Sequence, residues 1–338
     1  MDRREMLRGM AAVATSGAAL TACSPRESAK TDAPEQLLSE SVPISPPSPD
    51  YFVPERFQGK TIIVTGCARG MGAGAAQRAA REGANVVGVD WIEDLGAKTI
   101  SDIVAAGGKA TFVPGDVGTT EVCETMVKVA VDTYGGLDLA INNAGVMDGV
   151  FSGEEIDYQK QKALIFAPVH EASDDYWERV FRTNAGGVFR SLRAELRQMV
   201  AQKRGGAIVN VSSIAGMTGL AGNPAYVASK HAVNGLTRNA AIDYAPYGIR
   251  INSVNMAATD TPMVARAGVL VAEAAKANPS TGPNMGQAKT FSLLAYADPD
   301  HRPATVAEQV SMMLFLLSAE ASNFTGGVFP TDGGWTNY

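Results

Sequence analysis

Short runs of β-branched and other apolar residues alternate along this chain with longer alanine-rich segments whose apolar positions recur at helical spacing. Unbroken apolar runs are typical of strands buried on both faces, and strands that alternate with helices form parallel sheets. We therefore predict one doubly wound α/β domain in which helices cover both faces of a seven-stranded parallel sheet. The predicted strands lie within residues 60–66, 84–90, 109–116, 137–145, 206–213, 249–255 and 326–334.

The first 23 residues do not share this pattern. They contain the pair Arg3 and Arg4, a short and weakly apolar run, and small residues before Cys23. The arginine pair resembles the twin-arginine export signal, and residues 20–23 resemble the lipobox of bacterial lipoproteins. We therefore expect an exported protein, periplasmic or tethered to the membrane through a lipid on Cys23.

A cytoplasmic alternative stays open, because translation from Met6 or Met10 would discard the arginine pair. Residues 24–50 are rich in proline, serine and charged residues, so they predict a flexible tether. The folded domain is then expected to span residues 51–338.

Charge and cysteine content narrow the classes of partner. The formal net charge of −6 argues against nucleic acid as a partner and favours a small molecule. Three cysteines provide no disulfide framework, and no spacing of cysteine and histidine indicates a metal site.

A glycine-rich loop follows the first predicted strand. Gly66, Gly70 and Gly72 lie where a strand turns into a helix, which allows the backbone to approach the pyrophosphate of a dinucleotide. The second strand ends at Asp90, where a carboxylate would accept hydrogen bonds from an adenosine ribose and repel a 2′-phosphate. The pattern predicts NAD rather than NADP, although Arg69 in the loop offers a counter-charge for a phosphate.

A tyrosine and a lysine stand one helical turn apart in the segment NPAYVASKHA, residues 223–232. Positions i and i+4 of a helix share a face, so Tyr226 and Lys230 are expected to point into the same space. Ser213 ends the fifth predicted strand, and Asn184 lies within a helix expected at about 174–203.

Together these motifs resemble the short-chain dehydrogenase/reductase family, a Rossmann-type fold, from Phe57 to Trp335. The resemblance implies that the chain is an NAD-dependent oxidoreductase that interconverts secondary alcohols and ketones. It also implies a homotetramer or homodimer that pairs through the helices around 184–200 and 226–244. The implied cofactor-binding residues are Gly66, Arg69, Gly70, Met71, Gly72, Asp90, Asp116, Val117, Asn143, Ala144, Gly145, Tyr226, Lys230 and Thr261.

The resemblance also assigns catalytic roles. Tyr226 is the implied acid/base, and Lys230, together with the positive nicotinamide of the oxidised cofactor, is expected to lower the pKa of its phenol. Lys230 is also expected to hold the nicotinamide ribose. Ser213, rather than the neighbouring Ser212, is expected to hydrogen-bond the substrate oxygen. Asn184 resembles the residue that anchors a proton-relay water, although it is also interpretable as a polar residue inside a helix.

The chain departs from the family pattern in two ways. Met256 and Ala257 replace the usual Pro-Gly after the sixth strand, and residues 146–172 form an insert. We expect this insert and a long segment at 262–303 to lie over the substrate. Two alternatives remain open: an NADP-dependent reductase, which Arg69 supports, and a catalytically idle dinucleotide-binding protein.

Overall fold

The computed structural model describes residues 44–151, 153–277, 292–298 and 301–337. The predicted export signal at 1–23, most of the tether and part of the 262–303 segment lie outside the described residues. The strands are β1 (Thr61–Thr65), β2 (Asn85–Asp90), β3 (Lys109–Pro114), β4 (Leu139–Asn142), β5 (Gly206–Val211), β6 (Ile249–Met256) and β7 (Val328–Thr331). The helices are α2 (Gly70–Arg81), α3 (Glu93–Ala105), α4 (Thr120–Tyr134), α5 (Tyr158–Gln161), α6 (Asp174–Gln202), α7 (Pro224–Tyr244), α8 (Pro262–Ala277) and α9 (Val306–Leu317).

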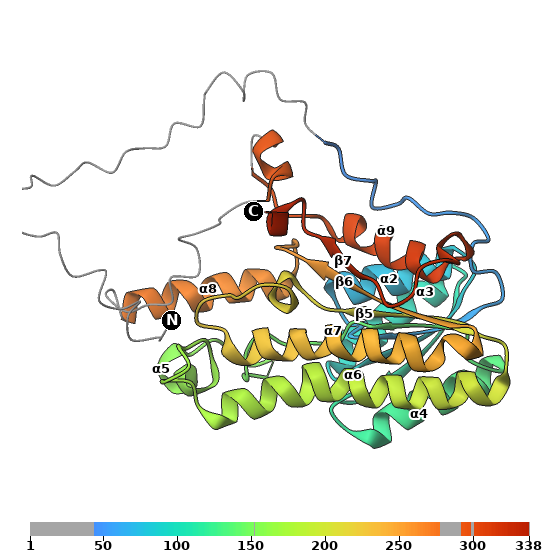
Figure 1. The fold of residues 1–338 in the computed structure, drawn as a ribbon, viewed down its shortest axis with the longest axis horizontal. Coiled ribbons are helices and arrows are strands. Elements are labelled where there is room, and N and C mark those ends of the chain that lie inside the picture. Colours follow the sequence, from blue (N-terminus) through green and yellow to red (C-terminus); the bar gives the residue numbers. More distant parts are fainter. Residues whose placement is uncertain (1–43, 152, 278–291, 299–300, 338) are drawn as a thin grey trace, which may run out of the picture. The chain divides into compact units, whose positions relative to one another are not determined.

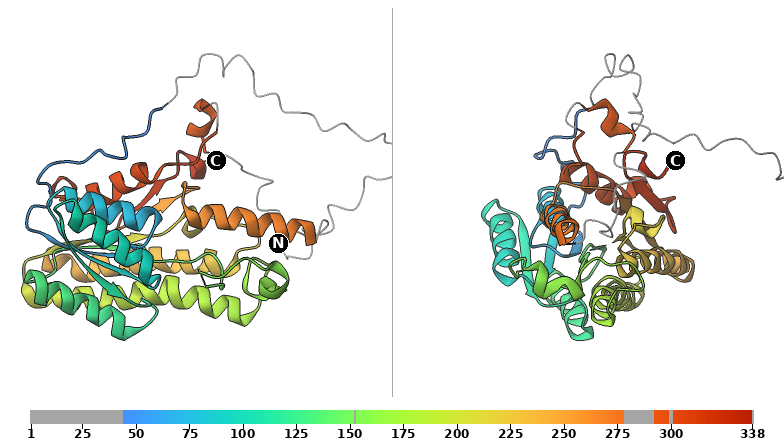
Figure 2. Two further views of the ribbon diagram at one scale, coloured as in Figure 1. Left: turned by 180° about the vertical axis from the view of Figure 1, so that it is seen from behind. Right: turned by 90° about the vertical axis from the view of Figure 1, so that its left-hand side faces the viewer.

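The strands form one seven-stranded parallel sheet in the order β3-β2-β1-β4-β5-β6-β7 (Figure 1). Residues of β1 alternate between two apolar layers, with Ile62 and Val64 facing α2, α3 and α9, and Ile63 facing α4, α6 and α7. Figure 2 shows the helices on both sides of the sheet. Every residue of β1 is buried, because helices cover both faces. The predicted doubly wound fold and its seven strands are confirmed.

The strand order reverses between β1 and β4, and this reversal positions the site. The chain runs outward from β1 to β3 and then returns to the centre of the sheet at β4. Loops on either side of such a reversal diverge at the carboxyl edge of the sheet, and ligands of open α/β sheets bind in the resulting crevice. The loops after β1 and β4 therefore flank the expected cofactor site.

The insert at 146–172 packs against the start of the 262–303 segment. Val150, Ile165 and Phe166 of the insert form one apolar cluster with Ala267 and Leu270 of α8. The insert and α8 therefore build one common wall beside the carboxyl edge of the sheet.

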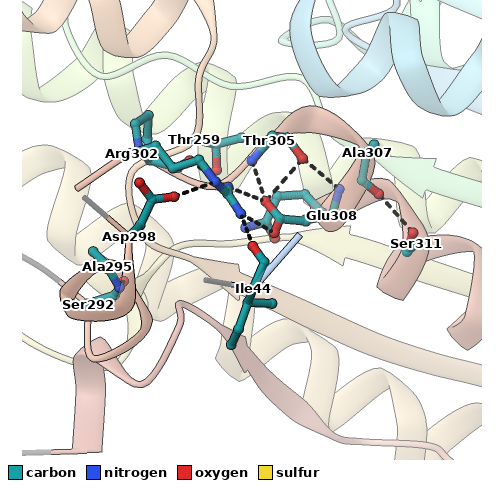
Figure 3. Close-up of polar contacts among 12 residues, drawn as sticks. Ile44, Thr259, Ser292, Ala295, Asp298, Arg302, Thr305, Ala307, Glu308 and Ser311 are labelled. Atoms are coloured by element: carbon teal, nitrogen blue, oxygen red, sulfur yellow. Dashed lines mark hydrogen bonds and ion pairs between the residues drawn. The ribbon is translucent and has the colours of Figure 1, made fainter. Parts of the chain in front are cut away.

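The base of the 262–303 segment is fixed to the body of the domain by ionic and backbone contacts. Arg302 lies between two carboxylates, with Nε 3.0 Å from Asp298 and Nη1 2.9 Å from Glu308 (Figure 3). Glu308 also completes the capping box with Thr305 that begins α9. On the other side Thr259, just after β6, pairs with Ala304 in a parallel bridge. Both ends of the segment are thus tied together next to α9.

The described end of the predicted tether, residues 44–50, contains no helix or strand. Farther on, the guanidinium of Arg78 lies over the ring of Tyr51 at 4.8 Å. None of the helices in the described part of the chain is long and apolar enough to cross a membrane.

A buried carboxyl group lies among the polar side chains between α6 and the sheet. Glu195 is completely buried and its Oε2 accepts a hydrogen bond of 3.0 Å from Asn142, which also donates to Asn210. Burial raises the pKa of Glu195 to about 7, and the Asn142 hydrogen bond acts in the opposite direction. The carboxylate form is therefore costly in this position.

We expect Glu195→Gln to stabilise the protein at pH 8 but not at pH 4.5. Folding raises the pKa from 4.5 to about 7, so between these pH values the unfolded chain releases the proton while the folded protein keeps it. This lowers the free energy of unfolding of the wild type by about 3 kcal/mol as the pH rises. The glutamine of the variant does not titrate and keeps an oxygen for Asn142. Thermal unfolding from pH 4.5 to 8 measures the effect, with the exposed Glu178→Gln of the same helix as the control. A stability difference that does not change with pH would contradict the prediction.

Candidate active site

Glycines keep the loop from β1 to α2 compact enough for a dinucleotide to approach its backbone closely. Gly66 has a φ of +72°, which strongly favours glycine. A Cβ on Gly72 would lie 1.9 Å from the carbonyl oxygen of Gly66, so no side chain fits there. The first turn of α2 therefore packs directly on the end of β1, and its N-terminus faces the cavity described below.

Asp90 ends β2 beside this loop. Its Oδ2 accepts a hydrogen bond of 2.9 Å from the backbone of Ala68, and its Oδ1 accepts one of 2.9 Å from the backbone of Ile92. Burial raises the pKa of Asp90, while these backbone donors and the charge of Arg69 hold it down. A carboxylate accepts about four hydrogen bonds, so these contacts orient Asp90 and leave acceptor capacity for a ribose diol.

The segment after β4 is fixed to the glycine loop. The Asn143 side chain donates to the carbonyl oxygens of Thr65 and Gly66 at 3.1 and 3.2 Å. The Thr65 hydroxyl accepts from the backbone of Asn143 and Ala144. On the neighbouring loop, Asp116 accepts from the backbone of Gly118 at 2.7 Å and pairs with Arg182 of α6.

Ser212 and Ser213 point in different directions at the end of β5. The hydroxyl of Ser212 donates to the backbone carbonyl of Lys230 at 3.1 Å. The hydroxyl of Ser213 accepts from the backbone of Ala215 at 3.2 Å and lies 3.4 Å from the carbonyl oxygen of Met256. Ser213 also lies close enough to Tyr226 to act on the pKa of its phenol. Of the two serines, Ser213 is therefore the one beside the phenol.

Tyr226 and Lys230 project from one face of α7. The Lys230 ammonium lies 5.6 Å from the centre of the Tyr226 ring and donates to the carbonyl oxygen of Val211 at 2.9 Å. Both residues are buried, with 7% and 4% of their surface exposed. Burial lowers the pKa of Lys230 to about 8. The amine is therefore mostly protonated at neutral pH.

In the chain alone, the pKa of Tyr226 lies above that of a free phenol. Burial raises it, and the nearby Ser213 acts in the opposite direction. Lys230 does not lower the pKa of Tyr226 below its usual value in the chain alone, because burial desolvates both groups. In the chain by itself, Tyr226 is a protonated phenol at neutral pH.

Asn184 of α6 connects three elements near the ammonium. Its Oδ1 accepts from the backbone of Val146 at 2.8 Å, and its Nδ2 donates to the Val146 carbonyl and to Ser229 of α7. A Cβ on Gly145 would lie 3.2 Å from Asn184 Oδ1 and 3.4 Å from Lys230 Nζ. Asn184 thus holds the turn after β4 against α7, next to Lys230.

Most of the groups described above line one cavity of about 460 Å³ at the carboxyl edge of the sheet. The cavity reaches from the glycine loop and Asp90 to Ser213, Tyr226 and Lys230, and Thr261, Met256 and Ala257 also line it. Asn184 is not among the lining residues. Among the predicted cofactor-binding residues, those that line the cavity are Gly66, Arg69, Gly70, Met71, Asp90, Asp116, Val117, Asn143, Ala144, Gly145, Tyr226, Lys230 and Thr261.

Two charged residues of the cavity wall were not anticipated from the sequence. Asp148 of the insert and Arg266 of α8 both line the cavity and lie 3.5 Å apart. They are 118 residues apart in the chain, and neither stands in a recognisable motif. Only the packing of the insert on α8 brings them together.

The sequence as a whole decides the family. A family model described as short chain dehydrogenase matches residues 60–268. The chain belongs to the short-chain dehydrogenase family. The family resemblance noted above is therefore confirmed, and this dehydrogenase is an NAD(P)-dependent oxidoreductase acting on alcohols.

Relatives and solved structures agree with this assignment. The dehydrogenase is 37% identical over 289 residues to 3β-hydroxysteroid dehydrogenase of Mediterraneibacter gnavus, covering 85% of this chain and 98% of that protein. It is 36% identical over 288 residues to cyclohexanol dehydrogenase of an Acinetobacter species, covering 85% of this chain and 99% of that protein. A short chain dehydrogenase from Mycobacterium paratuberculosis bound to NAD superposes with a TM-score of 0.72 at 26% identity, covering 84% of this chain and all of that one.

Proposed function

We propose that this dehydrogenase transfers a hydride between NAD and a secondary alicyclic alcohol or the corresponding ketone. The observation that carries the proposal is the convergence of Ser213, Tyr226 and Lys230 on one cavity that also reaches Asp90. The names of the two relatives, a hydroxysteroid dehydrogenase and a cyclohexanol dehydrogenase, support a ring alcohol as the substrate. The apolar lining near Tyr226, which includes Met147, Ile214 and Leu220, suits such a ring.

The side chains divide the chemistry between them. NAD, when bound, supplies the hydride acceptor. In alcohol oxidation Tyr226 takes the hydroxyl proton of the substrate while the substrate oxygen becomes a carbonyl, and in ketone reduction the proton moves the other way. Ser213 donates a hydrogen bond to that oxygen and polarises it. Since burial favours the phenol form, oxidation depends on the Lys230 ammonium to favour the phenolate, whereas reduction can begin from the phenol directly.

A spectrophotometric assay tests the proposal. Purified protein is incubated with cyclohexanol and NAD, and nicotinamide reduction is followed by absorbance, with cyclohexanone and NADH for the reverse direction. Turnover that requires a secondary alcohol supports the proposal. Bound nicotinamide cofactor without turnover of any cyclic alcohol or ketone would support the idle dinucleotide-binding alternative instead.

We expect Asp90→Ala to lower the ratio of kcat/KM for NAD to kcat/KM for NADP by at least about tenfold. Asp90 is buried at the end of β2, and its removal takes away both an acceptor for the ribose diol and a charge that repels a 2′-phosphate. The measurement is kcat/KM for each cofactor at saturating alcohol, with the exposed Glu93→Ala of α3 as the control. Equal use of both cofactors by the wild type would favour the NADP-dependent alternative, which Arg69 supports.

We also propose a homodimer or homotetramer that pairs through α6 and α7. Trp177 and Phe189 on α6 are 43% and 47% exposed, and Ile242 on α7 is 76% exposed, so both helices present large apolar side chains outside the core. The two helices lie side by side on one face of the sheet (Figure 1). Light scattering at micromolar concentration is expected to give at least twice the mass of one chain, and Phe189→Glu to lower it. A wild-type monomer would contradict the proposal.

Export and lipidation of Cys23 remain a proposal that rests on residues 1–23 alone. The twin-arginine route carries folded cargo, which suits a chain that folds around a cytoplasmic cofactor before it leaves the cell. Sequencing the mature N-terminus from fractionated cells tests the proposal. An intact protein found only in the cytosol would favour the cytoplasmic alternative and leave the dehydrogenase assignment unaffected.

A further inference from the structure

An ion pair interrupts the apolar wall of the active-site cavity. Asp148 belongs to the insert after β4 and Arg266 belongs to α8, and both line the cavity that contains Tyr226. Their side chains are only 9% and 15% exposed. Neither residue has a role in the hydride and proton transfers described above, so the pair needs a separate explanation.

The surroundings of the pair are apolar. Met147, Val150, Met263, Val264 and Ala267 line the cavity beside it. Two charges removed from water in such a wall gain little unless their remaining hydrogen-bonding capacity is used. A purely hydrocarbon ligand would leave that capacity unused and would exclude the water that satisfies it.

The hydrogen bonds that Arg266 makes to the protein are long. Arg266 Nη2 lies 3.5 Å from Asp148 Oδ1, and its Nη1 lies 3.4 Å from the carbonyl oxygen of Glu154, so both contacts are at the limit of hydrogen-bonding distance. Asp148 Oδ1 also accepts from the backbone of Val150 at 2.9 Å. Among the described residues, no hydrogen bond reaches Asp148 Oδ2. The pair thus offers both a carboxylate acceptor and guanidinium donors.

We propose that Asp148 and Arg266 bind a second hydroxyl group of the substrate, apart from the one that is oxidised, so that the preferred substrates are alicyclic diols. This inference rests on the proposed function. A hydroxyl donates one hydrogen bond and accepts others, so it can donate to Asp148 and accept from Arg266 at once. A substrate carboxylate fits less well, because Asp148 repels it and offsets the attraction of Arg266.

A purely structural role does not account for the pair. The insert and α8 are already joined by the apolar cluster of Val150, Ile165, Phe166, Ala267 and Leu270. An ion pair that only held the insert and α8 together would not need to line the cavity. An ion pair that binds a substrate must line it. The two roles also predict different results, because only a binding role makes the preference among substrates depend on the pair.

The test compares kcat/KM for trans-1,4-cyclohexanediol and cyclohexanol at saturating cofactor, counting the two equivalent hydroxyls of the diol. For the wild type we expect the diol to be preferred by at least about tenfold, mainly through a lower KM, because two charge-assisted hydrogen bonds are formed. In the double variant Asp148→Leu, Arg266→Met we expect that ratio to fall to about one or below. Replacing both charges by apolar groups leaves neither charge unpaired, so the double variant is expected to fold.

The controls separate the possible outcomes. Glu273→Gln removes a carboxylate of an exposed ion pair on the same helix, at 2.6 Å from Lys276, and is expected to leave the ratio unchanged. A wild type without diol preference, or a double variant that keeps it, would overturn the inference. Preference for trans-4-hydroxycyclohexanecarboxylate over the diol would overturn it in favour of an anion site. Absence of turnover with every alcohol would instead contradict the proposed function itself.

Discussion

Tyr226→Phe lowers kcat by at least a hundredfold and leaves the affinity for NAD nearly unchanged, if the phenol is the acid/base. The substitution deletes one oxygen and keeps the ring, which packs in a buried cluster with Tyr176, Val180, Ala215 and Ala225. General acid/base catalysis contributes about 10² to 10⁴ in rate, and that factor is what the variant loses. Steady-state kinetics with an alicyclic alcohol measure kcat, and calorimetric titration with NAD measures the cofactor affinity.

A neighbouring tyrosine provides a matched control for this experiment. Tyr176 is fully buried in the same cluster as Tyr226, and it does not line the active-site cavity. Tyr176→Phe removes the same kind of atom from a similar environment without touching the cavity lining, so we expect kcat to stay close to that of the wild type. Retention of more than about a hundredth of wild-type kcat by Tyr226→Phe would refute the proton-transfer role.

The fold was predictable because its strands are buried on both faces. Continuous apolar runs such as residues 61–65 mark strands that must be covered by helices, and the regular alternation then leaves few possible topologies. The glycine loop was predictable for a related reason. Gly66 and Gly72 meet conformational and steric conditions that other residues cannot meet, so their positions in the sequence carry information about structure.

Features that depend on contacts between distant segments were not predictable. Asp148 and Arg266 each stand alone in segments with no clear period, and their proximity depends on how the insert packs against α8. Glu195 is in helical register with the buried Val188, Leu192 and Met199 of α6, but its partner Asn142 lies on β4, 53 residues away in the sequence. The raised pKa of Tyr226 is a consequence of burial, which the spacing of Tyr226 and Lys230 does not reveal.

Lys230→Met is expected to lower kcat and to raise the KM for NAD, each by at least about tenfold. The buried ammonium lies 5.6 Å from the centre of the phenol ring, and the family resemblance also gives it the nicotinamide ribose as a partner. Its loss removes both the stabilisation of the phenolate and charge-assisted hydrogen bonds to the cofactor. Lys230→Arg keeps the positive charge but replaces the ammonium with a planar guanidinium. We expect it to recover part of the cofactor affinity but little of kcat. A variant that loses kcat alone would contradict the role in cofactor binding.

The same variant tests the electrostatic state of the site without any assay of activity. Burial lowers the pKa of Lys230 from 10.5 to about 8, so the wild type carries the cost of a buried ammonium below pH 8. As the pH rises from 8 to 10.5 the folded protein has released this proton and the unfolded chain has not, which stabilises the wild type by about 3 kcal/mol. The methionine of the variant has no proton to release. Denaturant unfolding should therefore show the stability of Lys230→Met falling relative to wild type across this window, and a difference independent of pH would mean that the amine titrates as it does in water.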